Sequence, residues 1–195
     1  MRPTREDAWE LLTEHTKNPS LIKHALAVEA AMRAYARKYG EDEEVWGIAG
    51  LIHDFDYEEH PTAEEHPLAG VAILEDLGWP REIIEAIKSH GTHLGLPRTT
   101  MMAKTLFAVD ELTGLLVACT LVRPDKSIMT LKVKSVRKKW RDKAFARGVN
   151  RQDIELGMSE LGVELSEHVG FVIEALRPVA EELGLAGVQP GGLSH

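Results

Sequence analysis

Four positions constrain the fold of this chain most, because each places a possible metal ligand in an otherwise apolar stretch: His24, the adjacent pair His53-Asp54, and Asp110. His24 lies in LIKHALAVEAAM, in line with apolar residues spaced three and four apart, and His53-Asp54 closes the run WGIAGLIHD. Asp110 lies in TLFAVDELTGLLVA, again in line with its neighbours at helical spacing. Imidazole and carboxylate groups are costly to bury unless they are paired, hydrogen-bonded or bound to a cation. One shared metal centre would explain all four.

Helical periodicity, interrupted by helix-start and helix-stop residues, runs through most of the chain. Asn18 followed by Pro19 is typical of a helix start, Gly40 of a stop, and Asp42 of the next cap. We expect helices over residues 19–39, 43–53, 68–77, 80–90, 100–121, 133–145, 151–161 and 166–183, and a polar loop between residues 53 and 68. The last helix should bend at Pro178. Alternating, strand-like patterns are absent, so the sequence predicts an all-α fold.

The length of 195 residues fits one domain with a real core. We expect a single helical domain over residues 1–187, with a metal-binding core over about 18–121, basic and C-terminal helices over 122–187, and a flexible tail over 188–195. No apolar run approaches the ~20 residues that span a bilayer. A charged N-terminus and a single cysteine, Cys119, which excludes an intramolecular disulfide, favour a cytoplasmic location.

Positive charge is concentrated in one segment. Residues 123–151 hold eleven Lys or Arg and two Asp or Glu, a local charge of +9, which leaves −17 for the rest of the chain. Arg123, Lys134, Lys138 and Lys139 are candidates for binding the phosphate groups of a substrate. The alternative is a solvated helical face paired with acidic neighbours. Aromatic residues are few in this segment, so base stacking with nucleic acid is not favoured.

The order of these residues, with His66 and His90 between the doublet and Asp110, resembles the H…HD…H…H…D signature of the HD-domain superfamily of metal-dependent phosphohydrolases. The resemblance covers about residues 21–116 and implies an all-helical domain that binds one or two divalent transition metal ions (Mn, Fe, Co, Ni or Zn). The implied first metal site contains His24, His53, Asp54 and Asp110. The implied second site contains Asp54, His66 and His90, so that Asp54 bridges the ions.

A wider resemblance, to a bacterial subgroup of predicted HD-superfamily hydrolases, is carried by stretches such as HDFDYEEHP and KSVRKKWRDKAFARGV and extends to about residue 183. Many relatives have a glycine and a lysine where this chain has Asp56 and Tyr57, so a role for that lysine cannot be transferred. Asp56 and Tyr57 could orient ligands or handle protons, or simply form a polar loop over a helix end. Glu111 follows Asp110 but should point about 100° away from it on a helix.

The expected function is hydrolysis of a small phosphorylated substrate, such as a nucleotide, by a metal-activated hydroxide. Asp54 would be central to catalysis, and His93 could protonate the leaving group or contact the substrate. Two alternatives stay open: a mixed-valent di-iron oxygenase with the same ligands, and a non-catalytic metal- or nucleotide-binding module. The sequence also leaves open whether copies of the chain associate into a homo-oligomer.

Overall fold

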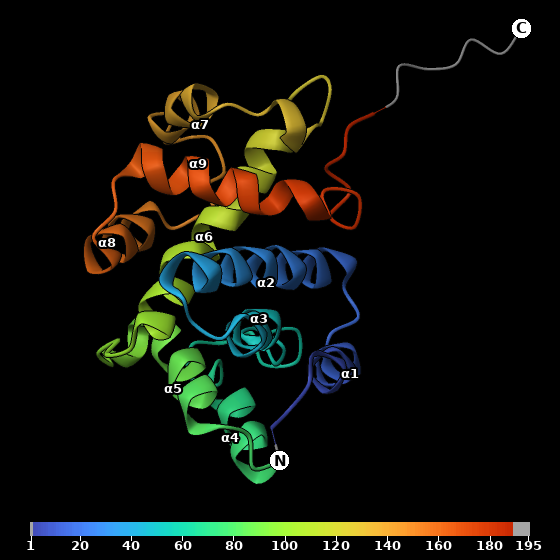
Figure 1. The fold of residues 1–195 in the computed structure, drawn as a ribbon, viewed down its shortest axis with the longest axis vertical. Coiled ribbons are helices and arrows are strands. Elements are labelled where there is room, and N and C mark those ends of the chain that lie inside the picture. Colours follow the sequence, from blue (N-terminus) through green and yellow to red (C-terminus); the bar gives the residue numbers. More distant parts are fainter. Residues whose placement is uncertain (1, 189–195) are drawn as a thin grey trace, which may run out of the picture.

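Helices make up nearly all the regular structure of this protein, as Figure 1 shows. The computed structural model describes residues 2–188, and within them it contains no β-strand. The helices are α1 (Arg5–His15), α2 (Pro19–Tyr39), α3 (Glu43–Ile52), α4 (Leu68–Asp76), α5 (Arg81–His90), α6 (Met101–Leu121), α7 (Val133–Trp140), α8 (Arg151–Leu161) and α9 (Leu165–Leu176). Three short 3-10 helices are η1 (Thr92–Leu94), η2 (Ile128–Thr130) and η3 (Arg177–Val179). The all-α prediction is confirmed. None of the helices in this part of the chain has the length and apolarity to cross a bilayer.

Local capping residues set the boundaries of α2 and the start of α3, as predicted. The Asn18 side chain accepts a hydrogen bond from the Ser20 N–H at 2.9 Å, and Gly40 ends α2 with a φ of 72°. The Asp42 carboxylate accepts the N–H groups of Glu44 and Val45 at 3.0 and 3.1 Å. Each cap satisfies backbone groups that have no partner inside the helix. His53 consequently lies at the C-terminal end of α3, next to Asp54.

α1 occupies a segment for which the sequence predicted no particular helix. Its start carries a reciprocal capping box: the Thr4 hydroxyl oxygen accepts the Asp7 N–H at 3.2 Å, and the Asp7 carboxylate accepts the Thr4 N–H at 2.7 Å. This pair was a usable sequence signal for a helix start. α1 packs against α3, whose far end carries His53.

Two predicted helices are shorter than expected. α7 ends at Trp140 rather than at residue 145, because the Arg151 guanidinium donates to the carbonyl oxygens of Trp140, Asp142 and Phe145 at 3.2, 3.1 and 2.7 Å. These bonds hold the chain after α7 in turns. The predicted helix over residues 166–183 is also wrong beyond Leu176, where α9 ends and η3 begins. Pro178 lacks an N–H and disfavours helical geometry at the preceding residue.

α2 lies in the middle of the molecule and packs against α3, α6 and α9 (Figure 1). α2 and α3 pack closely together, since a Cβ added to Gly50 of α3 would lie 2.9 Å from the Met32 side chain of α2. A buried hydrogen-bond chain joins three helices: His168 Nε2 donates to the Ala108 carbonyl at 2.8 Å, and the Tyr35 hydroxyl donates to His168 Nδ1 at 2.6 Å. α2, α6 and α9 are therefore held together by polar bonds as well as by apolar contact.

The chain after α9 returns to the segment before η2. Ala186 forms an isolated antiparallel bridge with Ser127, and the Val188 N–H donates to the Asp125 carbonyl at 3.0 Å. The flexible tail was predicted to begin at residue 188, and residues 189–195 lie outside the described part of the chain.

Candidate metal centre

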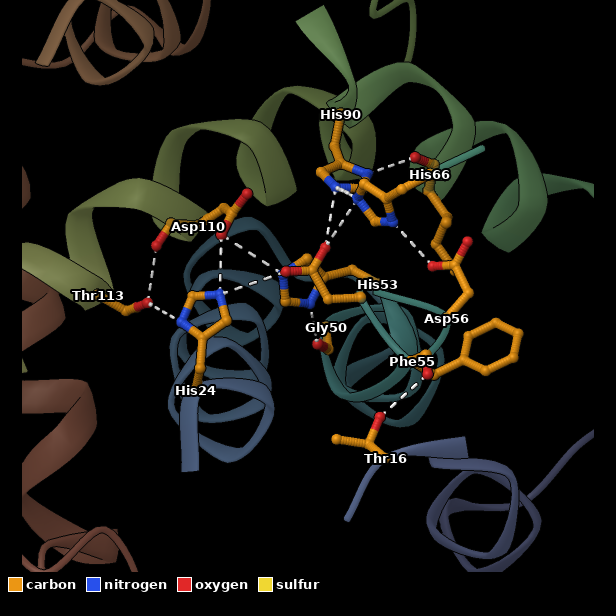
Figure 2. Close-up of polar contacts among 12 residues, drawn as sticks. Thr16, His24, Gly50, His53, Phe55, Asp56, His66, His90, Asp110 and Thr113 are labelled. Carbon is orange, nitrogen blue, oxygen red and sulfur yellow. Dashed lines mark hydrogen bonds and ion pairs between the residues drawn. The ribbon is translucent and has the colours of Figure 1, made fainter. Parts of the chain in front are cut away.

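Six side chains from five parts of the chain converge at the junction of α2, α3, α5 and α6 (Figure 2). His24 comes from α2, His53 and Asp54 from the end of α3, His66 from the loop before α4, His90 from the last turn of α5, and Asp110 from α6. They form two overlapping groups, and within each group the candidate ligand atoms lie within 4.8 Å of one another. The first group is His24, His53, Asp54 and Asp110, and the second is Asp54, His66 and His90.

Asp54 belongs to both groups because its two oxygen atoms face different histidines. Asp54 Oδ2 lies 3.3 Å from His53 Nε2 and 3.8 Å from His24 Nε2. Asp54 Oδ1 lies 3.2 Å from His66 Nε2 and 3.1 Å from His90 Nε2. A carboxylate in this position could contribute one oxygen to each of two neighbouring cations.

Backbone carbonyls fix the tautomers of His53 and His90. His53 Nδ1 lies 2.8 Å from the Gly50 carbonyl oxygen, and His90 Nδ1 lies 2.5 Å from the Ile87 carbonyl oxygen. A carbonyl can only accept, so in both rings Nδ1 carries the proton and Nε2 of the neutral ring presents a lone pair. His53 Nε2 is buried and has no hydrogen-bond partner in the described structure, although Asp110 Oδ1 lies 3.4 Å away.

Asp56 orients His66 in a similar way. Asp56 is 1% exposed, its Oδ2 accepts the Gly70 N–H at 2.8 Å, and its Oδ1 lies 2.8 Å from His66 Nδ1. His66 Nε2 then faces His90 Nε2 at 3.3 Å. Two neutral imidazole rings that each carry their proton on Nδ1 repel each other through the facing Nε2 lone pairs unless a metal ion or a proton lies between them. A carboxylate–histidine pair of this kind is typical of metal sites.

Thr113 supports His24 on the other side of the centre. The Thr113 hydroxyl donates to the Asp110 carbonyl at 2.8 Å, and its oxygen lies 3.5 Å from His24 Nδ1 (Figure 2). This arrangement favours a proton on Nδ1 and leaves His24 Nε2 to face Asp110 Oδ1 at 2.9 Å. The orienting roles of Asp56 and Thr113 complete the site. The sequence analysis had offered an orienting role for Asp56 only as one of two alternatives and had assigned no role to Thr113.

The carboxylates of the cluster favour positive charge on or between the neighbouring imidazoles. Burial lowers the pKa of His53, but the Asp54 and Asp110 carboxylates outweigh it and hold that pKa well above its ordinary value. For His66, the contacts with Asp54 and Asp56 outweigh burial and raise the pKa to about 9. Burial raises the pKa of Asp54 and of Asp110, but the histidines outweigh it and hold both below their ordinary value. Where no metal is bound, protons must supply this positive charge.

A cavity of about 290 Å³ is lined by five of the six candidate ligands, all but the buried His53, and also by Tyr57, Phe107 and His93. The exposed His93 ring lies over Gly91, next to His90. Glu111 and Asp153 add two carboxylates to those of Asp54 and Asp110, and no Lys or Arg is among the lining residues described. Burial and the neighbouring Asp110 charge raise the pKa of Glu111. Glu111 thus lines the cavity together with Asp110, although helical geometry predicted that the two side chains would point in different directions.

The predicted phosphate-binding residues are not brought to this cavity. Lys134 and Lys138 lie on α7 beside a separate surface hollow, and Figure 1 shows α9 between α7 and α2. Lys139 stacks over the Phe145 ring at 4.6 Å, and the Arg123 guanidinium pairs with Asp125 at 3.0 Å. Their role in substrate binding stays a prediction.

The donor set fits a transition metal. Imidazole nitrogen mixed with carboxylate oxygen suits Mn, Fe, Co, Ni or Zn better than Ca²⁺, which prefers oxygen alone. The buried Nε2 of His53, which has no hydrogen-bond partner among the described residues, points to the same conclusion, since a bound cation would satisfy it. Fold and site together thus define a helical protein with a candidate binuclear metal centre.

Comparison with known protein families identifies the class. Residues 21–115, just under half of the chain, match the family model of the HD domain, and most members of the HD-domain superfamily are metal-dependent hydrolases. The matched segment contains all six candidate ligands. A search of curated proteins and a search of solved structures each found no match.

Proposed function

We propose that this protein is a metal-dependent phosphohydrolase acting on a small phosphate ester, with a nucleotide among the candidates. The observation that carries the proposal is the position of Asp54, whose two oxygens face the histidines of two separate ligand groups. His24, His53, Asp54 and Asp110 would hold one ion, and Asp54, His66 and His90 a second. Such ions, when bound, lower the pKa of water towards neutrality and neutralise phosphoryl oxygens.

The residues of the chain would prepare and support this reaction. Asp56 and the backbone carbonyls of Gly50 and Ile87 hold three imidazoles with Nε2 towards the centre, so little reorganisation is needed when ions bind. Because the cavity lining described contains four carboxylates and no Lys or Arg, phosphate would be repelled from the metal-free site. Substrate binding should therefore depend on metal.

His93 is the candidate proton donor to the leaving group. It lines the same cavity as five of the six candidate ligands but belongs to neither ligand group. In hydrolysis a P–O bond forms to the attacking oxygen and the P–O bond to the alcohol breaks. The departing oxygen takes up a proton, and an exposed imidazole at the cavity wall is placed to supply it.

The test is phosphate release from a panel of nucleotides and simple phosphate monoesters after reconstitution with Mn²⁺, Co²⁺, Ni²⁺ or Fe²⁺. We expect release that requires metal and disappears in Asp54→Ala. Failure of the whole panel, together with oxygen uptake by the iron-loaded protein, would favour the oxygenase alternative. Ligand binding with neither activity would favour the binding module.

A further inference from the structure

A second cavity adjoins the metal cavity on the other side of His24. It has a volume of about 320 Å³ and lies where α2, α6 and the turn after η3 meet. Val117, Leu121 and Leu183 supply apolar walls. The two cavities have His24 and Gly114 as lining residues in common, so they meet across these two residues. We call this second cavity the apolar pocket.

Gly114 is the most informative residue at this junction. A glycine inside a helix costs about 0.5–1 kcal/mol relative to alanine, so its presence needs a reason. Close packing explains Gly157, where an added Cβ would lie 2.7 Å from Ala108 Cα. It does not explain Gly114, where an added Cβ would meet only Val149 Cγ2, at 3.9 Å. The missing side chain instead leaves open space where the two cavities meet.

The chemical character of the two cavities differs. The lining of the metal cavity contains four carboxylates, and metal ions bound there would attract a phosphoryl group. The apolar pocket has one charged residue that the metal cavity lacks, Lys23, which is exposed and lies against Gly184 at the rim. A ligand that spans both cavities would thus be anionic at one end and apolar at the other.

We propose that the apolar pocket binds the alkyl or aryl part of a phosphate monoester whose phosphoryl group lies at the metal centre. This inference rests on the proposed phosphohydrolase function and narrows its substrate class. Hydrolysis would release the alcohol into the apolar pocket, with the proton on its oxygen, while phosphate stays on the metal side. A pocket of this size and lining is typical of sites for small apolar groups.

A homologous series of esters tests the proposal. For the Mn²⁺-loaded protein, kcat/KM should rise from methyl to butyl to hexyl phosphate, by roughly fourfold per methylene that is buried. Gly114→Leu fills the junction and should lower the hexyl-to-methyl ratio of kcat/KM by roughly tenfold or more. Leu121→Gln, at a residue that is 46% exposed, should lower it several-fold without a folding defect. Gly148→Leu, where an added Cβ meets no atom within 4 Å, is the matched control and should keep the ratio.

Binding of 1-hexanol to the metal-free protein, followed by saturation-transfer NMR, gives a readout independent of turnover. We expect a signal with the native chain and with Gly148→Leu, and its loss with Gly114→Leu. If hexanol binds in this pattern but no ester is hydrolysed, the apolar pocket is supported as a binding site for alkyl groups and the phosphohydrolase proposal fails. If esters are hydrolysed with no dependence on chain length and hexanol does not bind, the apolar pocket is overturned.

Discussion

Replacing Asp54 with asparagine should weaken both metal positions at once, since Oδ2 faces His24 and His53 while Oδ1 faces His66 and His90. Asparagine keeps the size of the side chain and removes its charge. At about 4 Å and an effective dielectric constant of about 20, one unit-charge pair is worth roughly 4 kcal/mol. Each ion carries at least one unit of charge, so each dissociation constant should rise by about three powers of ten or more.

Calorimetric titration of chelator-stripped protein with Mn²⁺ or Zn²⁺ measures the number of ions and their affinities. His66→Ala is the matched comparison, because His66 belongs only to the second ligand group. His66→Ala should weaken the binding of one ion and leave the binding of the other unchanged. Asp56→Asn should weaken the affinity for the same ion by about 10- to 100-fold, since Asp56 only orients His66.

Two results would refute this reasoning. Native stoichiometry and affinity in Asp54→Asn would show that Asp54 does not bridge two ions. Loss of both ions in His66→Ala, with the fold intact by circular dichroism, would show that the two ligand groups are not separable sites. Asp54→Asn should also abolish phosphate release if the proposed function is right.

Four further outcomes follow from individual contacts in the structure. In the metal-free protein, the raised pKa of His66 contributes stability that is full below about pH 6.5 and is lost as the pH rises through about 9, so the melting temperature should fall over that range. The raised pKa of His53 acts in the same direction, and bound metal should remove the fall. Arg98→Ala removes bonds to Glu160 and to the Ser89 carbonyl, and urea unfolding should show a loss of about 2–3 kcal/mol. Tyr35→Phe leaves a buried imidazole nitrogen without its donor and should cost about 1–3 kcal/mol in the same assay. Lys138→Ala should leave KM for methyl phosphate unchanged, because Lys138 does not line the metal cavity, whereas a several-fold rise would support the substrate role predicted from sequence.

Helix boundaries could be predicted where the deciding residues are close in sequence. Asn18, Gly40 and Asp42 act on backbone groups a few positions away, and the sequence placed the corresponding boundaries correctly. α7 was predicted too long because Arg151, eleven residues beyond its end, binds the carbonyls that close it. A side chain that folds back over that distance leaves no periodic signal.

The candidate ligands could be predicted because each interrupts an apolar pattern or fits the order of a known signature. Their orientation could not be predicted. Asp56 lies at the edge of a polar loop, and only the folded loop brings its carboxylate to both Gly70 and His66. That no Lys or Arg is found in the described lining of the cavity likewise depends on how the helices pack, since the basic segment over residues 123–151 holds many of them but Lys134 and Lys138 line a separate hollow.

The contact between Gly157 and Ala108 bears on how the cavity keeps its width. Ala108 is two residues from Asp110, and Asp153, one helical turn before Gly157, forms part of the cavity wall. Any larger residue at position 157 would push α8 away from α6 and carry Asp153 outward with it. Substitutions at this buried contact between α6 and α8 could thereby change the width of the metal cavity while all six candidate ligands stay the same.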